Sequence, residues 1–487
     1  MASLHSFDPY EVFRLSVERF ADLPALRIGV RTWTYADLDM QAAAIAGWCD
    51  RNTPAGSRIA VHGRKELAAY AGILGILRSG RSYVPLHPDH PAARWRTILE
   101  RSSAAACVAD PSVVSMLRAV VDRPFLSNWE NEGTGPVRGG SEAYVMFTSG
   151  STGGPKGVPV SRLNVAAYLG HMLTHHPFTP QDRFSQLFAL TFDLSVHDLF
   201  VCWGSGGCLC VPEEDSALHI PSYIATNGIT AWFSVPSMAA LLRRMRALVP
   251  GAFPGLKHSF FCGEALPWDI ANAWAEAAPN SSVHNLYGPT EATIAITAFD
   301  VRAGAIDRRG TVPMGRPMGD HGVRLLNNDG GEEGELLLAG PQVTQGYLGD
   351  TAGTSRAFVR LPDEDAVWYR TGDRVRMDDE GIIHFLGRLD DQVKVLGHRV
   401  EPAEVDVILA PGVPNGTVLT LGVTQNGTTR LVTFIDTVMD TAPLMARLRQ
   451  QLPPYMIPDR IVVVDGFPIT AHGKIDRNAL LNIAGHG

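Results

Sequence analysis

Short apolar runs alternate with longer amphipathic stretches along the first two thirds of the chain. The short runs, bounded by glycine, proline or polar residues, predict buried strands at 59–61, 82–86, 143–147, 230–233 and 259–261. Apolar residues at helical spacing predict helices at 36–51, 65–78, 238–248 and 267–278. Strands that alternate with helices are typical of an α/β fold in layers with a mostly parallel sheet.

The pattern changes from about Val323. Runs at 334–340 and 382–387 have strand character and are joined by turns rich in glycine and aspartate, which predicts a small β-rich, barrel-like subdomain. After Asp390, a segment with charges of both signs (391–406) opens a final unit of roughly a hundred residues, a typical domain size. We therefore expect two domains, at 1–389 and 390–487.

Composition is that of an ordinary soluble enzyme. The 487 residues exceed what one hydrophobic core supports, and hydrophobic residues at 45% with charged residues at 19% show no disordered bias. A net charge of −8 without a basic block argues against nucleic acid or an anionic membrane as partner. No signal peptide and no run of ~18 apolar residues is apparent, so we expect a cytoplasmic protein, as a monomer. The six scattered cysteines predict buried free thiols.

The loop at 148–157 reads Thr-Ser-Gly-Ser-Thr-Gly-Gly-Pro-Lys-Gly and follows the strand predicted at 143–147. Backbone N–H groups, hydroxyls and one lysine after a strand are suited to binding phosphate. A P-loop is excluded, because Pro155 replaces its last glycine and Gly157 replaces its magnesium-binding hydroxyl. A flexible surface loop remains the alternative. The candidate phosphate residues are Thr148, Ser149, Ser151, Thr152 and Lys156.

Two further segments carry residues suited to a nucleotide. In 285–291 (Asn-Leu-Tyr-Gly-Pro-Thr-Glu), Tyr287 offers a ring on which adenine stacks, and Asn285 offers an amide for the edge of the base. Thr290 is suited to the α-phosphate and Glu291 to Mg²⁺. Asp373 ends the run 369–373, and its carboxylate is suited to accept hydrogen bonds from ribose hydroxyls. Arg388, in the segment 387–390, offers a cation. Taken alone, each segment is equally compatible with a turn whose polar side chains bind no ligand.

Together and in this order, these segments resemble the motifs of the adenylate-forming superfamily: acyl-CoA synthetases, luciferases and the adenylation domains of nonribosomal peptide synthesis. The resemblance runs from 34–38 to Lys474. It also includes the following segments: Gly80 with 83–86, 192–195, 387–399, 452–458 and 470–477. It implies a large N-terminal domain of layered α/β sheets and a small, mobile α+β C-terminal domain hinged at Asp390.

The resemblance also implies a reaction. The enzyme would use ATP and Mg²⁺ to join a substrate carboxylate to AMP, with Lys474, Lys156 and Thr290 acting on the phosphates. The phosphopantetheine thiol of a carrier protein would then take the acyl group, with the segment 387–399, which includes Arg388, brought in for this step. No carrier motif follows Lys474, so we expect a free-standing enzyme of natural-product biosynthesis that meets a separate carrier protein.

Asp193 distinguishes branches of the superfamily. In amino-acid adenylation domains the matching aspartate pairs with the α-ammonium of the substrate, and the structural alternative is a cap on a helix that begins near Ser195. By resemblance, the substrate pocket is lined by Leu194, His197, Phe233, Phe260, Cys262, Gly263, Leu286, Ile294 and Ala295.

The pocket residues predict a small neutral amino acid, because two phenylalanines take up volume and no lysine or arginine is present. Similarity to D-alanyl carrier protein ligases around 192–196 and 260–264 favours alanine over serine, glycine and cysteine. Proline is a competitor, since prolyl-AMP ligases resemble the chain around 192–200. An acyl-CoA ligase and a non-catalytic nucleotide-binding module are two further competing functions.

Overall fold

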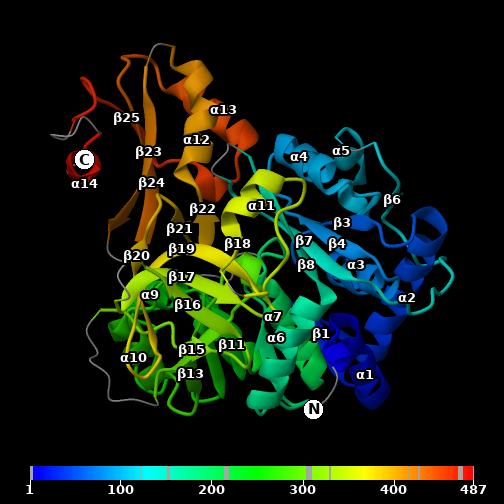
Figure 1. Ribbon diagram of the computed structural model, residues 1–487. Helices are drawn as coiled ribbons and strands as arrows, with labels where there is room; N and C mark the ends of the chain where they lie inside the picture. The colour runs from blue at the N-terminus through cyan, green and yellow to red at the C-terminus, as the bar shows by residue number, and fades with distance from the viewer. Residues whose placement is uncertain are drawn as a thin grey trace. The chain divides into compact units, whose positions relative to one another are not determined.

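The structure is a computed structural model of the chain (Figure 1). The residues it describes are 4–120, 122–150, 154–212, 219–302, 310–327, 331–362, 364–414, 416–425, 428–469 and 475–485. Three predicted site residues, Ser151, Thr152 and Lys474, lie outside these ranges. Their predicted roles therefore rest on the sequence alone.

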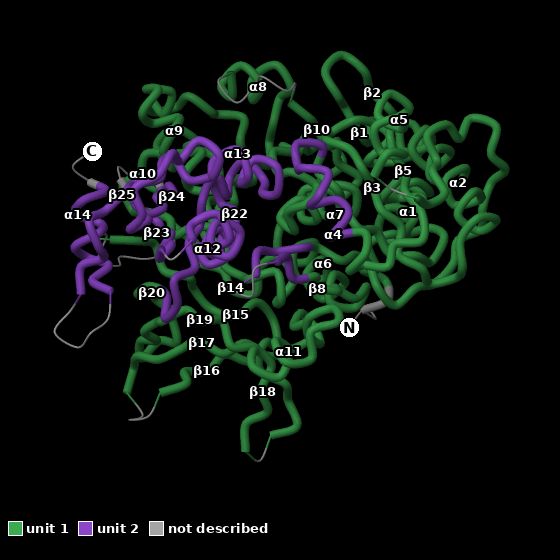
Figure 2. Tube along the Cα trace, turned by 90° about the horizontal axis from the view of Figure 1, so that it is seen from above, with its two compact units in different colours: residues 1–87, 99–146, 157–387 green, residues 88–98, 147–156, 388–487 purple. Residues whose placement is uncertain are grey.

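The chain divides into two compact units, drawn in green and purple in Figure 2. The first unit comprises residues 1–87, 99–146 and 157–387, and the second comprises 88–98, 147–156 and 388–487. The second unit thus combines the C-terminal part of the chain with two short segments from the N-terminal half, one of which is the predicted phosphate loop. Residue 388 lies close to the predicted domain boundary at 389/390, and the hinge at Asp390 stays a prediction.

A six-stranded sheet with the order β6-β5-β3-β4-β7-β8 contains the first predicted strands. Its strands β3 (Arg58–His62) and β4 (Ser82–Leu86) pair in parallel and are connected by α3 (Leu67–Arg78). Every residue of β4 is buried, which explains its continuous apolar run. The neighbouring elements are α2 (Tyr35–Asn52), α4 (Ala92–Ser102), β5 (Ala106–Ala109), α5 (Val114–Arg118), β6 (Phe125–Leu126), β7 (Glu142–Thr148) and β8 (Lys156–Ser161).

A nine-stranded sheet with the order β15-β14-β13-β12-β11-β9-β10-β1-β2 carries most of the predicted site. The pairings from β13 to β1 are parallel, while β2, β14 and β15 add antiparallel edges. The strands are β1 (Pro24–Ile28), β2 (Arg31–Thr34), β9 (Arg183–Ser185), β10 (Cys208–Val211), β11 (Ala231–Ser234), β12 (His258–Phe261), β13 (Ser282–Tyr287), β14 (Thr297–Asp300) and β15 (Arg316–Pro317). A mostly parallel sheet in an α/β fold is therefore confirmed.

The helices of this part of the chain are α1 (Pro9–Phe20), α6 (Arg162–His175), α7 (Leu194–Ser205), α8 (Ile220–Asn227), α9 (Pro236–Arg244) and α10 (Trp268–Ala277). The helices predicted at 36–51, 65–78 and 267–278 agree with α2, α3 and α10 to within two residues at each end. The remaining helices of the first unit, apart from α9, had no predicted bounds. The range predicted for α9, 238–248, begins too late, because Pro236 occupies the first turn and starts the helix. It also ends too late, since the helix ends at Arg244 and Arg246 has a φ of +59°. No helix among the described residues is long and apolar enough to cross a membrane.

The β-rich subdomain is a five-stranded sheet in which β16–β17, β17–β19 and β18–β19 pair antiparallel and β20 pairs with β19. Along β19, buried and more exposed positions alternate, as expected for a sheet with one covered face. Its elements are β16 (Gly322–Leu326), β17 (Glu333–Ala339), α11 (Thr351–Ala357), β18 (Phe358–Arg360), β19 (Val367–Met377) and β20 (Ile383–Arg388).

The second unit has helices on a small sheet, as the α+β prediction requires. Strand β24 contributes to two hydrophobic clusters, with Leu431 and Ile435 in one and Val432 and Phe434 in the other, because successive side chains of a strand face opposite sides. The elements are β21 (Val393–Val395), β22 (His398–Val400), α12 (Pro402–Leu409), β23 (Val418–Gln425), β24 (Thr428–Ile435), α13 (Ala442–Gln451), β25 (Arg460–Val463) and α14 (Arg477–Gly485).

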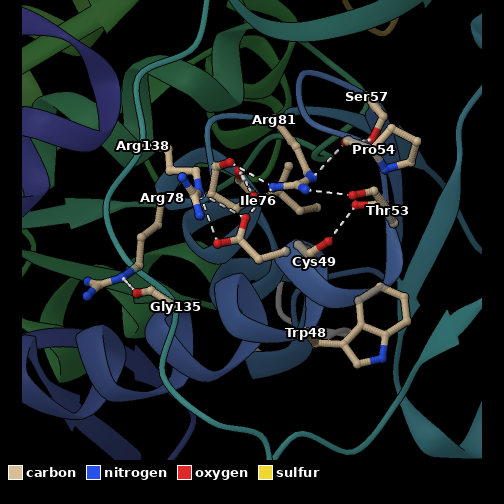
Figure 3. A network of polar contacts seen from close by, with 12 residues as sticks. Trp48, Cys49, Thr53, Pro54, Ser57, Ile76, Arg78, Arg81, Gly135 and Arg138 are labelled. Atoms are coloured by element: carbon tan, nitrogen blue, oxygen red, sulfur yellow. Dashed lines mark hydrogen bonds and ion pairs between the residues drawn. The ribbon is translucent and has the colours of Figure 1, made fainter.

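A buried arginine joins the C-terminal ends of α2 and α3 in the first unit (Figure 3). The Arg81 side chain is 2% exposed and donates to Asp50 Oδ1 at 2.9 Å. It also donates to the backbone carbonyls of Thr53 at 2.7 Å and Ser79 at 2.8 Å. Arg138 bonds the same carboxylate from a side chain that is 55% exposed. The buried cation is thus balanced by one carboxylate and several carbonyl oxygens.

Replacing Arg81 by methionine is expected to lower the free energy of unfolding of the first unit by about 3–5 kcal/mol, because the substitution leaves buried acceptors without their donor. Arg138→Met is the matched control, since it breaks an ion pair of the same carboxylate at the surface and is expected to cost under about 1 kcal/mol. The measurement is urea unfolding followed by tryptophan fluorescence. Equal shifts of the two midpoints would contradict the role of the buried network.

All six cysteines are buried free thiols, which confirms the expectation from their scattered positions. Burial raises the pKa of the Cys49 and Cys107 thiols to about 12. Both thiols therefore stay protonated at neutral pH.

Candidate functional site

Two of the predicted nucleotide residues come together in the first unit. Tyr287 is the last residue of β13, and Asp373 lies in β19 just after Gly372, whose φ is +70°. The Tyr287 hydroxyl donates to Asp373 Oδ2 at 2.5 Å. The Asp373 backbone N–H donates to Thr371 Oγ1 at 3.0 Å, and the carboxylate is held in a largely buried position. An aromatic ring and a carboxylate therefore lie side by side, as a nucleoside site requires.

Asn285 lies two residues before Tyr287 and is 4% exposed. Its side-chain amide nitrogen donates to the carbonyls of Pro313 at 2.8 Å and Val312 at 3.4 Å. Among the described residues, its Oδ1 atom has no hydrogen-bond partner. A buried acceptor without a partner points to a ligand or a water molecule, and it suits the exocyclic amino group of adenine.

Glu291, the predicted magnesium ligand, is completely buried in the 3₁₀ turn η4 (Thr290–Ala292). The Tyr347 hydroxyl donates to Glu291 Oε1 at 2.7 Å. Thr290, the predicted α-phosphate residue, begins the turn and is half-buried. Tyr347 was not predicted from the sequence, because a tyrosine in a glycine-rich turn far along the chain carries no signal of its partner.

The backbone after this turn is strained. Thr293 and Ile294 are completely buried and have φ values of +56° and +71°, where a β-branched residue is an outlier. The buried side chain of Gln342 holds this segment, since its Nε2 donates to the carbonyls of Thr293 at 3.0 Å and Ala295 at 2.7 Å. The Thr293 hydroxyl donates back to the Gln342 carbonyl at 2.6 Å. Strain that the surroundings hold in place is typical of functional sites.

The residues predicted to line the substrate pocket converge from helix α7 and strands β11, β12 and β13. We call them the substrate cluster: Asp193, Leu194, His197, Phe233, Phe260, Cys262, Gly263, Leu286, Ile294 and Ala295. All of them except Gly263 are at most 3% exposed. Phe233 and Phe260 are register neighbours on β11 and β12, and their ring centroids lie 6.3 Å apart. The His197 ring lies 4.4 Å from Phe233 and 5.4 Å from Phe260.

Gly263 follows β12 with a φ of +92°, where a side chain would be strained. A Cβ atom there would touch the side chains of Val235, Leu194 and Phe192. Glycine at this position thus lets the chain turn beside the first residue of α7.

Asp193 stands at the N-cap position of α7, but its side chain makes no capping hydrogen bond. The carboxylate is 3% exposed. Burial is the main cause of the raised pKa of the Tyr83 and Tyr144 hydroxyls, and the nearby Asp193 charge raises the pKa of both further. The structural alternative, a carboxylate retained to cap the helix, is therefore not what the geometry shows. A buried carboxylate at the edge of an apolar cluster favours a cationic ligand.

The predicted phosphate loop belongs to the second unit, where Thr148 ends β7 and Lys156 begins β8. Ser149 Oγ accepts from the Glu401 backbone N–H at 3.0 Å and donates to the Arg399 carbonyl at 2.7 Å. The Gly150 backbone N–H donates to Glu404 Oε2 at 3.2 Å. The loop therefore presents a backbone donor to an anion, here a carboxylate.

Glu404 is 1% exposed and is held by Arg94, which is 5% exposed and donates to Oε1 at 2.5 Å. This buried ion pair joins two parts of the second unit that are far apart in sequence. Neither residue was predicted to belong to the site. The only sequence signal was the charged segment 391–406, which contains Glu404 but gives no indication of Arg94.

Arg388, a predicted catalytic residue, and Asp390, the predicted hinge, pair with each other. Arg388 donates from Nε to Oδ1 at 2.8 Å and from Nη2 to Oδ2 at 2.6 Å. Such two-point contact fixes both side chains relative to each other. The Asp390 side chain is 47% exposed, so this pair lies at the surface of its unit.

A family model for AMP-binding enzymes matches residues 13–348. The chain belongs to the AMP-binding enzyme family. This confirms the resemblance to adenylate-forming enzymes that the ordered motifs indicated.

Relatives of this AMP-binding enzyme include a D-alanine--D-alanyl carrier protein ligase from Lacticaseibacillus rhamnosus. It is 30% identical over 480 residues, which cover 93% of this chain and 94% of the relative. Among solved structures, the Vibrio cholerae adenylation domain AlmE in complex with glycyl-adenosine-5'-phosphate is similar, with a TM-score of 0.89 and 29% identity. The match covers 99% of this chain and 98% of AlmE.

Another similar structure is PA1221, an NRPS protein containing adenylation and PCP domains. It has a TM-score of 0.85 and 25% identity, and the match covers 98% of this chain and 84% of that one. The layered α/β fold of the AMP-binding enzyme is therefore that of adenylation domains.

The predicted magnesium ligand is a single carboxylate, Glu291. The described residues contain no group of three or more His, Cys, Asp or Glu side chains arranged to hold a metal ion. Mg²⁺ is usually bound by one or two carboxylates together with substrate phosphates and water. One buried carboxylate, Glu291, with one oxygen bonded by Tyr347, fits that donor set.

Proposed function

We propose that this AMP-binding enzyme activates a small neutral amino acid, alanine first, as aminoacyl-AMP. It then transfers the aminoacyl group to the phosphopantetheine thiol of a separate carrier protein, in the cytoplasm and as a monomer. The observation that carries the proposal is Asp193, a buried carboxylate that does not cap its helix and borders a compact apolar cluster. The named activities of the D-alanyl carrier protein ligase and of AlmE support it.

The chain's residues fit the nucleotide. Tyr287 offers its ring to adenine, Asn285 Oδ1 offers an acceptor to the amino group of the base, and Asp373 accepts from the ribose hydroxyls. Thr290 and Lys156 bind phosphate oxygens. Mg²⁺ on Glu291 neutralises phosphate charge when it is bound.

In the first step, the substrate carboxylate attacks the α-phosphorus of ATP and pyrophosphate leaves. A carboxylate is a poor nucleophile toward a polyanion, so the enzyme must hold both reactants in line and offset their charge. Asp193 holds the α-ammonium, which orients the carboxylate, and Lys474 bridges the carboxylate and the α-phosphate.

In the second step, the carrier thiol attacks the carbonyl carbon of the mixed anhydride and AMP leaves. The bond between the carbonyl carbon and the phosphate oxygen breaks as the thioester forms. We assign to this step a rotation about Asp390 that withdraws Lys474 and brings in the segment 387–399, including Arg388.

The substrate cluster sets the side-chain preference. Phe233, Phe260 and Leu286 fill volume, and the cluster contains no lysine or arginine. Burial lowers the pKa of His197 to about 3, so the imidazole is neutral at physiological pH and offers no cation to an acidic side chain. The similarity of residues 192–196 and 260–264 to D-alanyl carrier protein ligases favours alanine over serine, glycine and cysteine.

Two other functions are compatible with the family. A prolyl-AMP ligase would use the same two steps, and the similarity of residues 192–200 to such enzymes supports it. An acyl-CoA ligase would need no ammonium partner, and Asp193 would then have a structural role. ATP–pyrophosphate exchange with a panel of amino acids, fatty acids and aryl acids separates these functions. ATP–pyrophosphate exchange that depends only on fatty or aryl acids, and not on amino acids, would contradict the proposal.

Phe233→Ala is expected to shift the preference from alanine toward larger apolar amino acids. The wild type should favour alanine over leucine or phenylalanine at least about tenfold, because each methylene forced into a filled site costs about 1–3 kcal/mol. Removing the ring opens volume, at about 3–5 kcal/mol in stability. The measurement is kcat/KM in pyrophosphate exchange for each amino acid.

Phe261→Ala is the matched control for this shift. Phe261 is equally buried and follows Phe260 on β12, but it belongs to a different hydrophobic cluster. Its loss is expected to lower stability without changing the order of substrates. A wild type that prefers a long, charged or aromatic amino acid would overturn the small-pocket interpretation.

A further inference from the structure

A tyrosine outside the substrate cluster is bonded to its only histidine. Tyr168 lies on α6, and its hydroxyl is 2.7 Å from Nδ1 of His197 on α7. The two side chains are 0% and 1% exposed. A buried polar pair of this kind has a defined donor and a defined acceptor, because water does not compete.

The tyrosine is the donor. Burial raises the pKa of Tyr168 well above its usual value, so the hydroxyl keeps its proton. Within the described chain, Nδ1 is the one acceptor within reach of that O–H group. If Nδ1 carried the proton instead, the tyrosine proton would be buried without an acceptor, which costs about 1–3 kcal/mol. Nδ1 therefore accepts, and the neutral ring carries its proton on Nε2.

The hydrogen bond with Tyr168 occupies Nδ1 of His197 and does not involve the Nε2–H group. The ring lies against Phe233 and Phe260, both of which belong to the substrate cluster. A buried N–H group within that cluster needs an acceptor from a water molecule or from the substrate.

We propose that Tyr168 is a positioning residue for substrate choice, because it fixes His197 as the Nε2–H tautomer and so gives the substrate cluster one hydrogen-bond donor. The inference rests on the proposed function and deepens it. Serine fills nearly the same volume as alanine but carries an oxygen that accepts from Nε2–H. The Tyr168–His197 pair therefore sets how closely serine competes with alanine, although Tyr168 itself contacts no substrate.

The first test compares L-serine with L-alanine in ATP–pyrophosphate exchange. In Tyr168→Phe, the ring of His197 loses its fixed tautomer, and the ratio of kcat/KM for serine to that for alanine is expected to fall about tenfold. Tyr223→Phe is the matched control. Tyr223 is also buried, and its hydroxyl donates a single bond, to the Cys210 carbonyl at 2.6 Å. Its loss is expected to leave the ratio unchanged.

An unchanged ratio in Tyr168→Phe, or an equal fall in Tyr223→Phe, would overturn the inference while leaving amino-acid activation intact. If the wild type shows no exchange with any amino acid, it is the proposed function that fails. The two failures are thus distinct.

The second test needs neither activity nor a folded variant of Tyr168. The ring nitrogens of the ¹⁵N-labelled wild-type enzyme report the tautomer directly in a long-range ¹H–¹⁵N spectrum at pH 7. The His197 signals are assigned by their loss in His197→Phe, since the chain has 16 histidines. A proton on Nε2 with a bare Nδ1 is the expected result, and a proton on Nδ1 would overturn the inference.

Discussion

Asp193→Ala is expected to abolish amino-acid-dependent ATP–pyrophosphate exchange while leaving the fold intact. The carboxylate is 3% exposed, and its side chain makes no capping bond to α7, so its removal does not uncap the helix. Removing one partner of a buried charge pair costs about 3–5 kcal/mol, a loss of at least a hundredfold in kcat/KM. Exchange is measured with alanine at saturating ATP.

Asp269→Ala is the control for Asp193. Asp269 lies in the first turn of α10, and its side chain is 63% exposed and paired with Arg243. Loss of such a surface pair is expected to change exchange by less than about twofold. Near-normal activity of Asp193→Ala with alanine would refute the assignment of this carboxylate to the α-ammonium.

Lys474→Ala is expected to separate the two half-reactions. Its cation acts on the phosphoryl step, so adenylation should fall by about 10²–10³-fold. Thioester formation from pre-made aminoacyl-AMP should stay close to that of the wild type, because the proposed rotation about Asp390 withdraws the lysine before this step. The two rates are measured by pyrophosphate release and by loading of the carrier protein. This expectation comes from the sequence motif, since Lys474 lies outside the described residues.

Arg477→Ala is the control for the loss of a nearby cation. Arg477 begins α14 and pairs with Asp391 from a side chain that is 46% exposed. Both half-reactions should stay near the wild-type rate. Equal loss of both steps in Lys474→Ala would contradict the proposed rotation about Asp390.

Local sequence determined most of the elements, for a physical reason that β4 illustrates. A parallel strand covered on both faces must be apolar throughout, so the run 82–86 coincides with the strand. The start of α9 was misplaced because a proline at the first helical position outweighs apolar spacing. The composition of the second unit was beyond prediction from local pattern. It depends on contacts such as Arg94 with Glu404, which join distant segments and leave no periodicity in either.

The candidate site was predicted as residue types rather than as contacts. The sequence motifs predicted Tyr287 and Asp373 as nucleotide-binding residues, and in the structure their side chains lie within hydrogen-bond distance of each other. The residues that were missed, Tyr168, Gln342 and Tyr347, act through buried hydrogen bonds to a side chain or to backbone carbonyls. Nothing in the sequence around a buried tyrosine distinguishes one that orients a functional side chain from one that only fills space.

The burial of the cysteines has a practical consequence. All six thiols belong to the first unit, and the residue ranges of the second unit contain none. Only a thiolate reacts quickly with alkylating reagents, and thiols such as Cys49, with a pKa near 12, become reactive when the surrounding core opens. The rate of alkylation in the native enzyme therefore measures how often the first unit opens. It does not report movements of the second unit, which contains no cysteine. One cysteine introduced at an exposed position of the second unit would carry a fluorophore there without competing labels.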